Sequence, residues 1–221
     1  MILKSLMISR LVIQKTFIRS LAKSTLEGFD SCPFPRIFAP NPLHWLRNVF
    51  QARFLIQPFF DPRYSNSEFI KGAEMAISTV SGFLADNDFK SLESGLVTLD
   101  TLQGLKKDLP RLSEPQKSML RVSEVGYSFV YRIGIIMPGT EGTERHVETT
   151  IVSFYHPSLG VLPSGASFSD FRDTIDSEGG LLVANYRFTR NFSKGLDLEK
   201  SNWIINGVNH FHLSSLMQPS Y

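Results

Sequence analysis

The 221-residue sequence contains a single cysteine, Cys32, which excludes an internal disulfide framework and any cysteine-based zinc site. It also lacks long apolar runs, because no stretch reaches the roughly 18 to 20 residues that a membrane-spanning helix needs. The nucleotide-binding motifs G-x-G-x-x-G and G-x-x-x-x-G-K-[ST] are absent, and so are H-E-x-x-H and G-x-S-x-G. No common catalytic or nucleotide-binding motif therefore points to an enzyme class.

Acidic residues are missing from the first 26 positions, and this splits the modest net charge of +2 into two unequal parts. Residues 1–31 carry five basic and two acidic side chains, a net charge of +3. The remaining residues carry 18 basic and 19 acidic side chains, a net charge of −1. The body of the chain is therefore near neutral, which disfavours tight generic binding to DNA or RNA.

The first 31 residues combine regularly spaced cations with apolar and hydroxylated residues, as an amphipathic basic helix would. This composition is typical of a mitochondrial presequence, and we assign residues 1–31 to one. A secretory signal needs 7 to 15 uninterrupted apolar residues, and Arg10 and Lys15 break every such run. The alternatives are an ordinary basic amphipathic helix and a membrane anchor that lies on the bilayer surface.

Residues 32–60 are interpreted as a proline-rich linker followed by an aromatic amphipathic helix. Four prolines between Cys32 and Pro42 exclude regular helix there, and the helix is expected to begin near Pro42 and end before Pro58. Arg47, Asn48, Gln51 and Arg53 form its narrow polar side. Either the helix is buried on the domain core, or it lies on a membrane or in a partner's groove. The candidate membrane- or partner-binding residues are Trp45, Leu46, Val49, Phe50, Phe54 and Leu55.

Residues 61–215 are predicted to form one α+β domain, with helices first and strands after them. Helical spacing or capping signals predict helices from Ser65 to Leu84, after Asp88, from Leu99 to Leu109 and from Ser113 to Leu120. Alternating patterns then predict about four antiparallel strands, near residues 129–137, 145–155, 182–192 and 203–213. In the first strand, alternation would put Phe129, Ile133 and Ile135 on one face.

Candidate metal or acid–base residues are few. Glu144, His146 and Glu148 would share a strand face, but they adjoin a glycine-rich turn where polar side chains normally face water. His210 and His212 also share a face, without a third ligand, and are interpreted as solvent-facing or core-edge residues. Neither these residues nor Asp170 and Asp173 give any sign of a buried acid–base pair. No catalytic residue, metal or cofactor is assigned.

Five runs resemble, in order and spacing, a mitochondrial family of domains related to the C-terminal part of the import motor's membrane-docking subunit. They are FFDP at 59–62, EFIKGAEMA at 68–76, DFKSL at 88–92, YRFTRNF at 186–192 and WII at 203–205. The likeness extends over residues 41–213, and the segments 138–144 and 157–180 diverge most from the family pattern. Each motif is short, so the resemblance depends on their shared order.

The resemblance implies a cone-shaped fold, in which a curved antiparallel sheet wraps helices around a pocket. It also implies a non-catalytic protein of the mitochondrial matrix, peripheral on the inner membrane. Its expected partners are the m-AAA protease, the mitochondrial ribosome and newly made inner-membrane proteins, such as the essential regulator subunit of the calcium uniporter. One alternative is a structural or membrane-docking subunit of the large mitochondrial ribosomal particle, since a related ribosomal protein shares the domain. The other is a small-molecule enzyme that uses the cone pocket.

Overall fold

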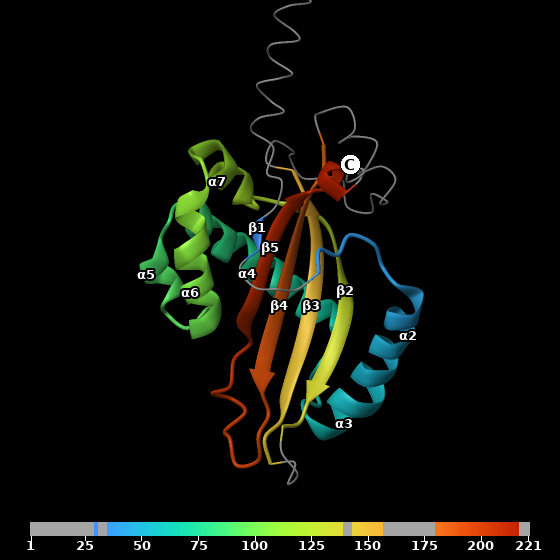
Figure 1. The fold of residues 1–221 in the computed structure, drawn as a ribbon. Coiled ribbons are helices and arrows are strands. Elements are labelled where there is room, and N and C mark those ends of the chain that lie inside the picture. Colours follow the sequence, from blue (N-terminus) through green and yellow to red (C-terminus); the bar gives the residue numbers. More distant parts are fainter. Residues whose placement is uncertain (1–28, 31–34, 139–142, 157–179, 217–221) are drawn as a thin grey trace, which may run out of the picture.

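The computed structural model describes residues 29–30, 35–138, 143–156 and 180–216 (Figure 1). Its centre is one open antiparallel sheet with the strand order β1-β5-β4-β3-β2. The strands are β1 (Phe29–Asp30), β2 (Val125–Ile136), β3 (His146–Tyr155), β4 (Leu182–Asn191) and β5 (Ile204–His212). The α+β class expected from the sequence is confirmed, with four long strands joined by β1 at one edge.

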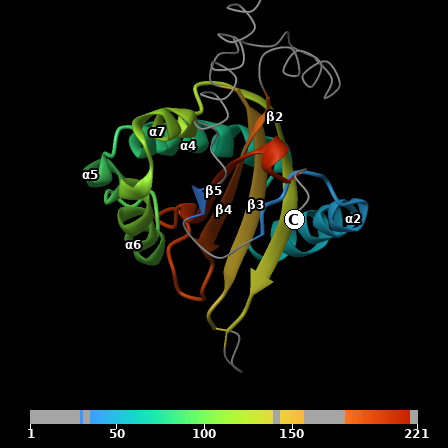
Figure 2. The same ribbon diagram turned by 45° about the horizontal axis from the view of Figure 1, so that its top comes forward.

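The helices lie on one face of the sheet and along its two sides (Figures 1 and 2). The long helix α4 crosses behind the strands, and α5, α6 and α7 gather beyond β5. A separate helical rod, made of α2, a π-helical turn and α3, runs beside β2. The bounds are α2 (Pro42–Phe50), π-helix (Gln51–Ile56), α3 (Gln57–Phe59), α4 (Asn66–Ala85), α5 (Phe89–Leu92), α6 (Leu99–Asp108) and α7 (Glu114–Leu120), with 3-10 turns at Leu109–Arg111 and Leu213–Leu216.

Local capping explains where α5 and α7 begin. Asp88 accepts a hydrogen bond from the backbone N–H of Ser91 at the start of α5, and Ser113 and Gln116 form the expected capping box of α7. These helices and α4 are confirmed within a residue or two of their predicted bounds.

The predicted end of the aromatic helix was wrong, because the rod continues through Pro58 to Phe59. Proline normally breaks a helix by removing a donor and colliding with the carbonyl group one turn earlier. Here the preceding turn is π-helical, and the N–H of Gln57 reaches the carbonyl group of Ala52, five residues back. The wider turn relieves the crowding ahead of Pro58, so the chain stays helical.

Two β-bulges change which face of the sheet a side chain occupies. One lies in β2 between Val130 and Arg132, and the other leaves Asn206 as an extra residue of β5. Phe129 therefore packs on the outer face, away from α4, whereas Ile133 and Ile135 pack on the inner face. The simple alternation expected for this strand was wrong, because a bulge shifts the two-residue period by one position.

The main core lies between the inner face and α4 to α7. Ile77 and Leu84 of α4, Leu105 of α6 and Val208 of β5 are fully buried there. Each such side chain contributes roughly 1.5 to 3 kcal/mol when it leaves water. A smaller cluster on the outer face includes Phe154 and Phe211 and is covered in part by Ile37.

The strand β1 lies inside the segment that the sequence assigns to a presequence. Its Phe29 is buried in the main core, and its two residues pair with Asn209 and His210 of β5. Residues 1–28 lie outside the described part, so the presequence stays a prediction. A cleavage that keeps β1 in the sheet must fall before Phe29.

A fully buried polar network crosses the main core. The hydroxyl oxygen of Tyr155 lies 2.8 Å from the carbonyl oxygen of Met119 and 2.8 Å from Nδ1 of His210. The hydroxyl oxygen of Tyr186 lies 3.0 Å from Nε2 of His210. A carbonyl can only accept, so Tyr155 donates to Met119, His210 donates from Nδ1–H to Tyr155, and Nε2 accepts from Tyr186. The interpretation of His210 as a solvent-facing or core-edge residue was therefore wrong.

We predict that His210 makes the fold sensitive to acid. Burial lowers the pKa of His210 to about 3, whereas an unfolded histidine titrates near 6.5. The contribution of neutral His210 to the free energy of unfolding is complete above about pH 6.5. As the pH falls from there toward 3, the free energy of unfolding decreases by about 1.4 kcal/mol per pH unit. His210→Gln keeps a donor and an acceptor but cannot titrate, so the stability difference between wild type and variant should shrink on acidification. Denaturant unfolding between pH 7 and pH 4.5 measures this stability difference. A difference that does not change with pH would contradict the role of His210 in acid sensitivity.

Candidate partner-binding surface

One stripe of the helical rod, partly polar and partly apolar, faces the sheet. His44, Asn48, Ala52 and Ile56 are spaced four residues apart and are half-buried or buried. Ile56 is in contact with Ile133 and Val147 in a satellite core, so the lower half of the rod has an apolar contact. The upper half is attached mainly by polar side chains.

Asn48 is the central attachment. It is 3% exposed, and its amide group faces the β-bulge of β2. Its Nδ2 donates to the carbonyl oxygens of Val130 at 3.3 Å and Tyr131 at 3.0 Å, and its Oδ1 accepts from the N–H of Ile133 at 2.9 Å. The side chain thus binds β2 as the peptide group of a neighbouring strand would, and it satisfies backbone groups that this edge strand would otherwise leave without a partner strand.

Two neighbours extend this attachment. The guanidinium group of Arg47 donates to the carbonyl oxygen of Ile133 at 3.4 Å. The ring of His44 packs edge-on against Tyr131, with 4.9 Å between the ring centroids. The rod is therefore held in a defined rotation about its own axis, with its opposite side turned to solvent.

The solvent side of the rod is apolar. We call the following residues, which are 42% to 76% exposed and of which Phe54 lies in the π-helical turn that continues α2, the apolar face of α2: Leu43, Trp45, Leu46, Val49, Phe50 and Phe54. Phe50 and Phe54 are in contact, with ring centroids 5.0 Å apart. Five of the six candidates from the sequence lie on this face, and Leu55 is half-buried. Burial of these five side chains on the domain core was thus the wrong alternative, and a contiguous exposed apolar surface of this kind typically marks an interaction site.

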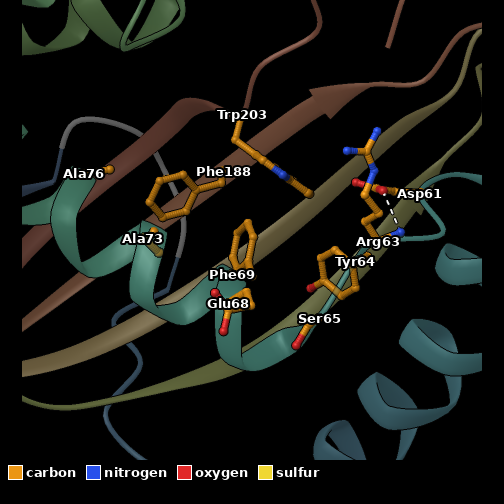
Figure 3. Close-up of a pocket in the computed structure, with 11 residues that line it drawn as sticks. Asp61, Arg63, Tyr64, Ser65, Glu68, Phe69, Ala73, Ala76, Phe188 and Trp203 are labelled. Carbon is orange, nitrogen blue, oxygen red and sulfur yellow. Dashed lines mark hydrogen bonds between the residues drawn. The ribbon is translucent and has the colours of Figure 1, made fainter. Parts of the chain in front are cut away.

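An aromatic pocket of about 360 Å³ lies between the start of α4 and the entrance of β5 (Figure 3). Phe69 and Ala73 of α4 lie on one side, and Phe188 of β4 and Trp203 lie opposite. Phe69 is in edge-to-face contact with Trp203, with 4.7 Å between the ring centroids. Gly72 leaves the α4 side open, since a Cβ built there would meet nothing within 4 Å.

The polar residues around the pocket mainly hold its walls. Asp61 forms a half-buried ion pair with Arg190 at 2.9 Å, and Glu68 is largely exposed beside Lys71. Burial raises the pKa of the Tyr64 phenol to about 12, so this group stays neutral and uncharged at physiological pH. The pocket is therefore suited to an apolar side chain or ligand.

The metal and acid–base candidates that the structure describes do not gather into a site. Within the described residues, no group of three or more His, Cys, Asp or Glu side chains could hold a metal ion. Glu148 accepts a hydrogen bond from the side-chain amide of Asn206, and His146 is only half-buried. Asp170 and Asp173 lie outside the described residues.

Sequence reasoning missed Asn48 as an anchor and Trp203 as a pocket wall. The four-residue spacing of His44, Asn48, Ala52 and Ile56 was a signal that this stripe is buried. Trp203 carried no comparable signal, because its position depends on β5. Across the described ranges, no helix is both long and apolar enough to cross a membrane.

The chain is similar to the mitochondrial m-AAA protease-interacting protein 1 of several mammals. It is 30% identical to the Rattus norvegicus protein over 181 residues, which are 78% of this chain and 60% of the rat protein. The Bos taurus protein is 30% identical over 213 residues, covering 85% of this chain and 70% of the bovine one. The chain thus spans about 60% of the length of the rat and Homo sapiens relatives. No protein-family model and no solved structure matches it.

We predict that Asn48→Asp loosens the rod from β2. The carboxylate keeps the shape of the amide but cannot donate, so it would face two carbonyl oxygens and weaken the fold by roughly 1 to 3 kcal/mol. Hydrogen exchange should show lost protection in residues 44–56 while α4 stays protected. Asn202→Asp is the matched control, because Asn202 is exposed in the loop before β5 and a charge there faces water. Unchanged protection of the rod would contradict the anchoring role of Asn48.

We predict opposite effects for alanine at two glycines that both have room for a Cβ. Gly72 is helical, so Gly72→Ala should raise the free energy of unfolding by about 0.5 to 1 kcal/mol. Gly95 has a φ of +95°, a conformation that alanine adopts only with strain, so Gly95→Ala should lower it. Thermal unfolding of the two variants measures the difference. Destabilisation by Gly72→Ala would show that the open side of the pocket is needed by the fold itself.

Proposed function

Since the chain belongs to the family of m-AAA protease-interacting protein 1, we propose that it is a non-catalytic adaptor that binds the m-AAA protease. The apolar face of α2 is the observation that carries this proposal. Its six exposed side chains are held outward by polar contacts on the other side of the helix. A helix displayed in this way matches the helix-in-groove mode of recognition, in which residues three and four positions apart enter a partner's groove.

The size of the face favours a groove over pairing with a second copy. A stable protein–protein interface buries about 800 Å² on each partner, and one short helix pressed against an identical helix supplies less than that. A concave partner covers more of the same side chains. Trp45 and Phe50 are the expected anchors, because large aromatic residues contribute most to such interfaces.

The proposed location is the mitochondrial matrix, with peripheral contact to the inner membrane. The relatives are named as mitochondrial proteins. Residues 42–60 contain no acidic side chain, and Arg53 lies exposed among the apolar residues of the rod. An apolar helix face with cations and without acids is compatible with an anionic bilayer beside the protease.

The finer role is assistance to newly made inner-membrane proteins, with the mitochondrial ribosome as a transient partner and the essential regulator subunit of the calcium uniporter as one client. The aromatic pocket supports this role, because its volume suits one or two apolar side chains of an extended segment. Gly72→Leu would put a larger side chain at this open side, where a Cβ meets nothing within 4 Å. It should reduce client capture and leave protease binding unchanged.

The test is affinity purification of the m-AAA protease from detergent-solubilised mitochondria. We expect Trp45→Ala and Phe50→Ala each to weaken capture tenfold or more, which corresponds to about 1.4 kcal/mol. Leu99→Ala is the matched control, because Leu99 is an equally exposed apolar residue on α6, away from the face.

Equal capture by all three variants, at unchanged folding, would refute the adaptor role of α2. Carbonate extraction of the protein from inner membranes is the expected result for peripheral contact. Stable co-migration with the large ribosomal subunit through high salt would instead support the ribosomal alternative.

A further inference from the structure

A second cavity, unrelated to the aromatic pocket, lies on the outer face of the sheet. It has a volume of about 290 Å³ and is lined by residues of the rod, of the strands and of the segment that leads to α2, including Pro35 and Ile37. Three arginines from three different elements line it: Arg47 from α2, Arg132 from β2 and Arg187 from β4. We call it the arginine pocket.

The strand register places two of these arginines around a small residue. Arg132 pairs with Thr150 of β3, and Thr150 pairs with Arg187 of β4, so the three residues form one row across the sheet. Side chains in such a row point to the same face. Thr150 is short and lines the same cavity as both arginines. Arg187 is held in place there, because its Nε and Nη2 donate to Asn206 at 3.0 and 3.2 Å. The bulge in β2 sets this register.

The charge of the pocket differs from that of the domain around it. Residues after position 31 carry a net charge of −1, yet the pocket has three cations and one acid, Glu148. The carboxylate of Glu148 lies 3.9 Å from Arg187 and accepts from Asn206, so it offsets one of the three cations. Arg132 is exposed, and among the described residues it makes no hydrogen bond or ion pair.

We propose that the arginine pocket binds a phosphate group. Three arginines that line one cavity from three elements suit the several oxygens of a tetrahedral phosphate, whereas a planar carboxylate is satisfied by a single fork. The hydroxyl group of Thr150 supplies a further donor at the floor. The volume exceeds that of the phosphate alone, and Pro35, Ile37 and Ile136 provide an apolar wall for a small organic part. The ligand is therefore a phosphate ester.

The first experiment is calorimetric titration of the folded protein with inorganic phosphate and with glycerol 3-phosphate, at constant ionic strength set with chloride. Arg132→Gln should raise the dissociation constant about tenfold, because it removes one charge-assisted contact. Arg53→Gln is the matched control, since Arg53 bonds to Gln57 on the same rod and lies outside the pocket. It should leave the dissociation constant unchanged.

The second experiment distinguishes the two sources of a phosphate ester, a phospholipid headgroup and a soluble metabolite. The protein is floated with phosphatidylglycerol vesicles. If Arg132→Gln weakens its binding to the vesicles, and glycerol 3-phosphate inhibits that binding, the phospholipid headgroup is the source. If Arg132→Gln raises the dissociation constant in the titration but does not change vesicle binding, the source is a soluble ester. Absence of phosphate binding at millimolar concentration, or an equal effect of Arg53→Gln, overturns the proposal.

Discussion

The amide group of Asn48 is the contact on which the functional arrangement of the molecule depends. It bonds to backbone groups of the edge strand β2 beside its bulge, and it helps to fix the rotation of α2 about its axis. With a different rotation, the apolar face would meet the sheet and Arg47 would leave the arginine pocket. One polar side chain thus determines both what α2 shows to solvent and what lies beneath it.

Those parts of the fold that depend on neighbouring residues could be predicted from the sequence. The capping box at Ser113 and the helical spacing in α4 are local signals, and both elements lie where expected. The bulges in β2 and β5 could not be predicted, since an extra residue in a strand is defined only by the strand opposite. The end of the helix predicted before Pro58 was wrong for a related reason, because the effect of a proline depends on the width of the preceding helical turn.

The residues of the candidate site could be predicted from the sequence, but the direction in which their side chains point could not. Aromatic and aliphatic residues identified Trp45 and Phe50 as adhesive side chains, but apolar residues usually face a core. Their outward direction follows from Asn48, whose partners lie more than 80 positions further along the chain. The arginine pocket shows the same limit. Arg47, Arg132 and Arg187 are scattered in sequence, and only the strand register and the placement of α2 bring them together.

The attachment of α2, whose apolar face points away from the domain, also affects how this surface can change over evolutionary time. In an ordinary amphipathic helix, the residues that give stability are the apolar ones, so a substitution there alters folding and binding together. Here the stabilising contacts come from Asn48, Ala52 and Ile56, while Leu46 and Phe50 contribute little to the core. The binding residues can therefore be exchanged one at a time at small cost to the fold. Partner choice can diverge among related proteins while the domain beneath stays the same.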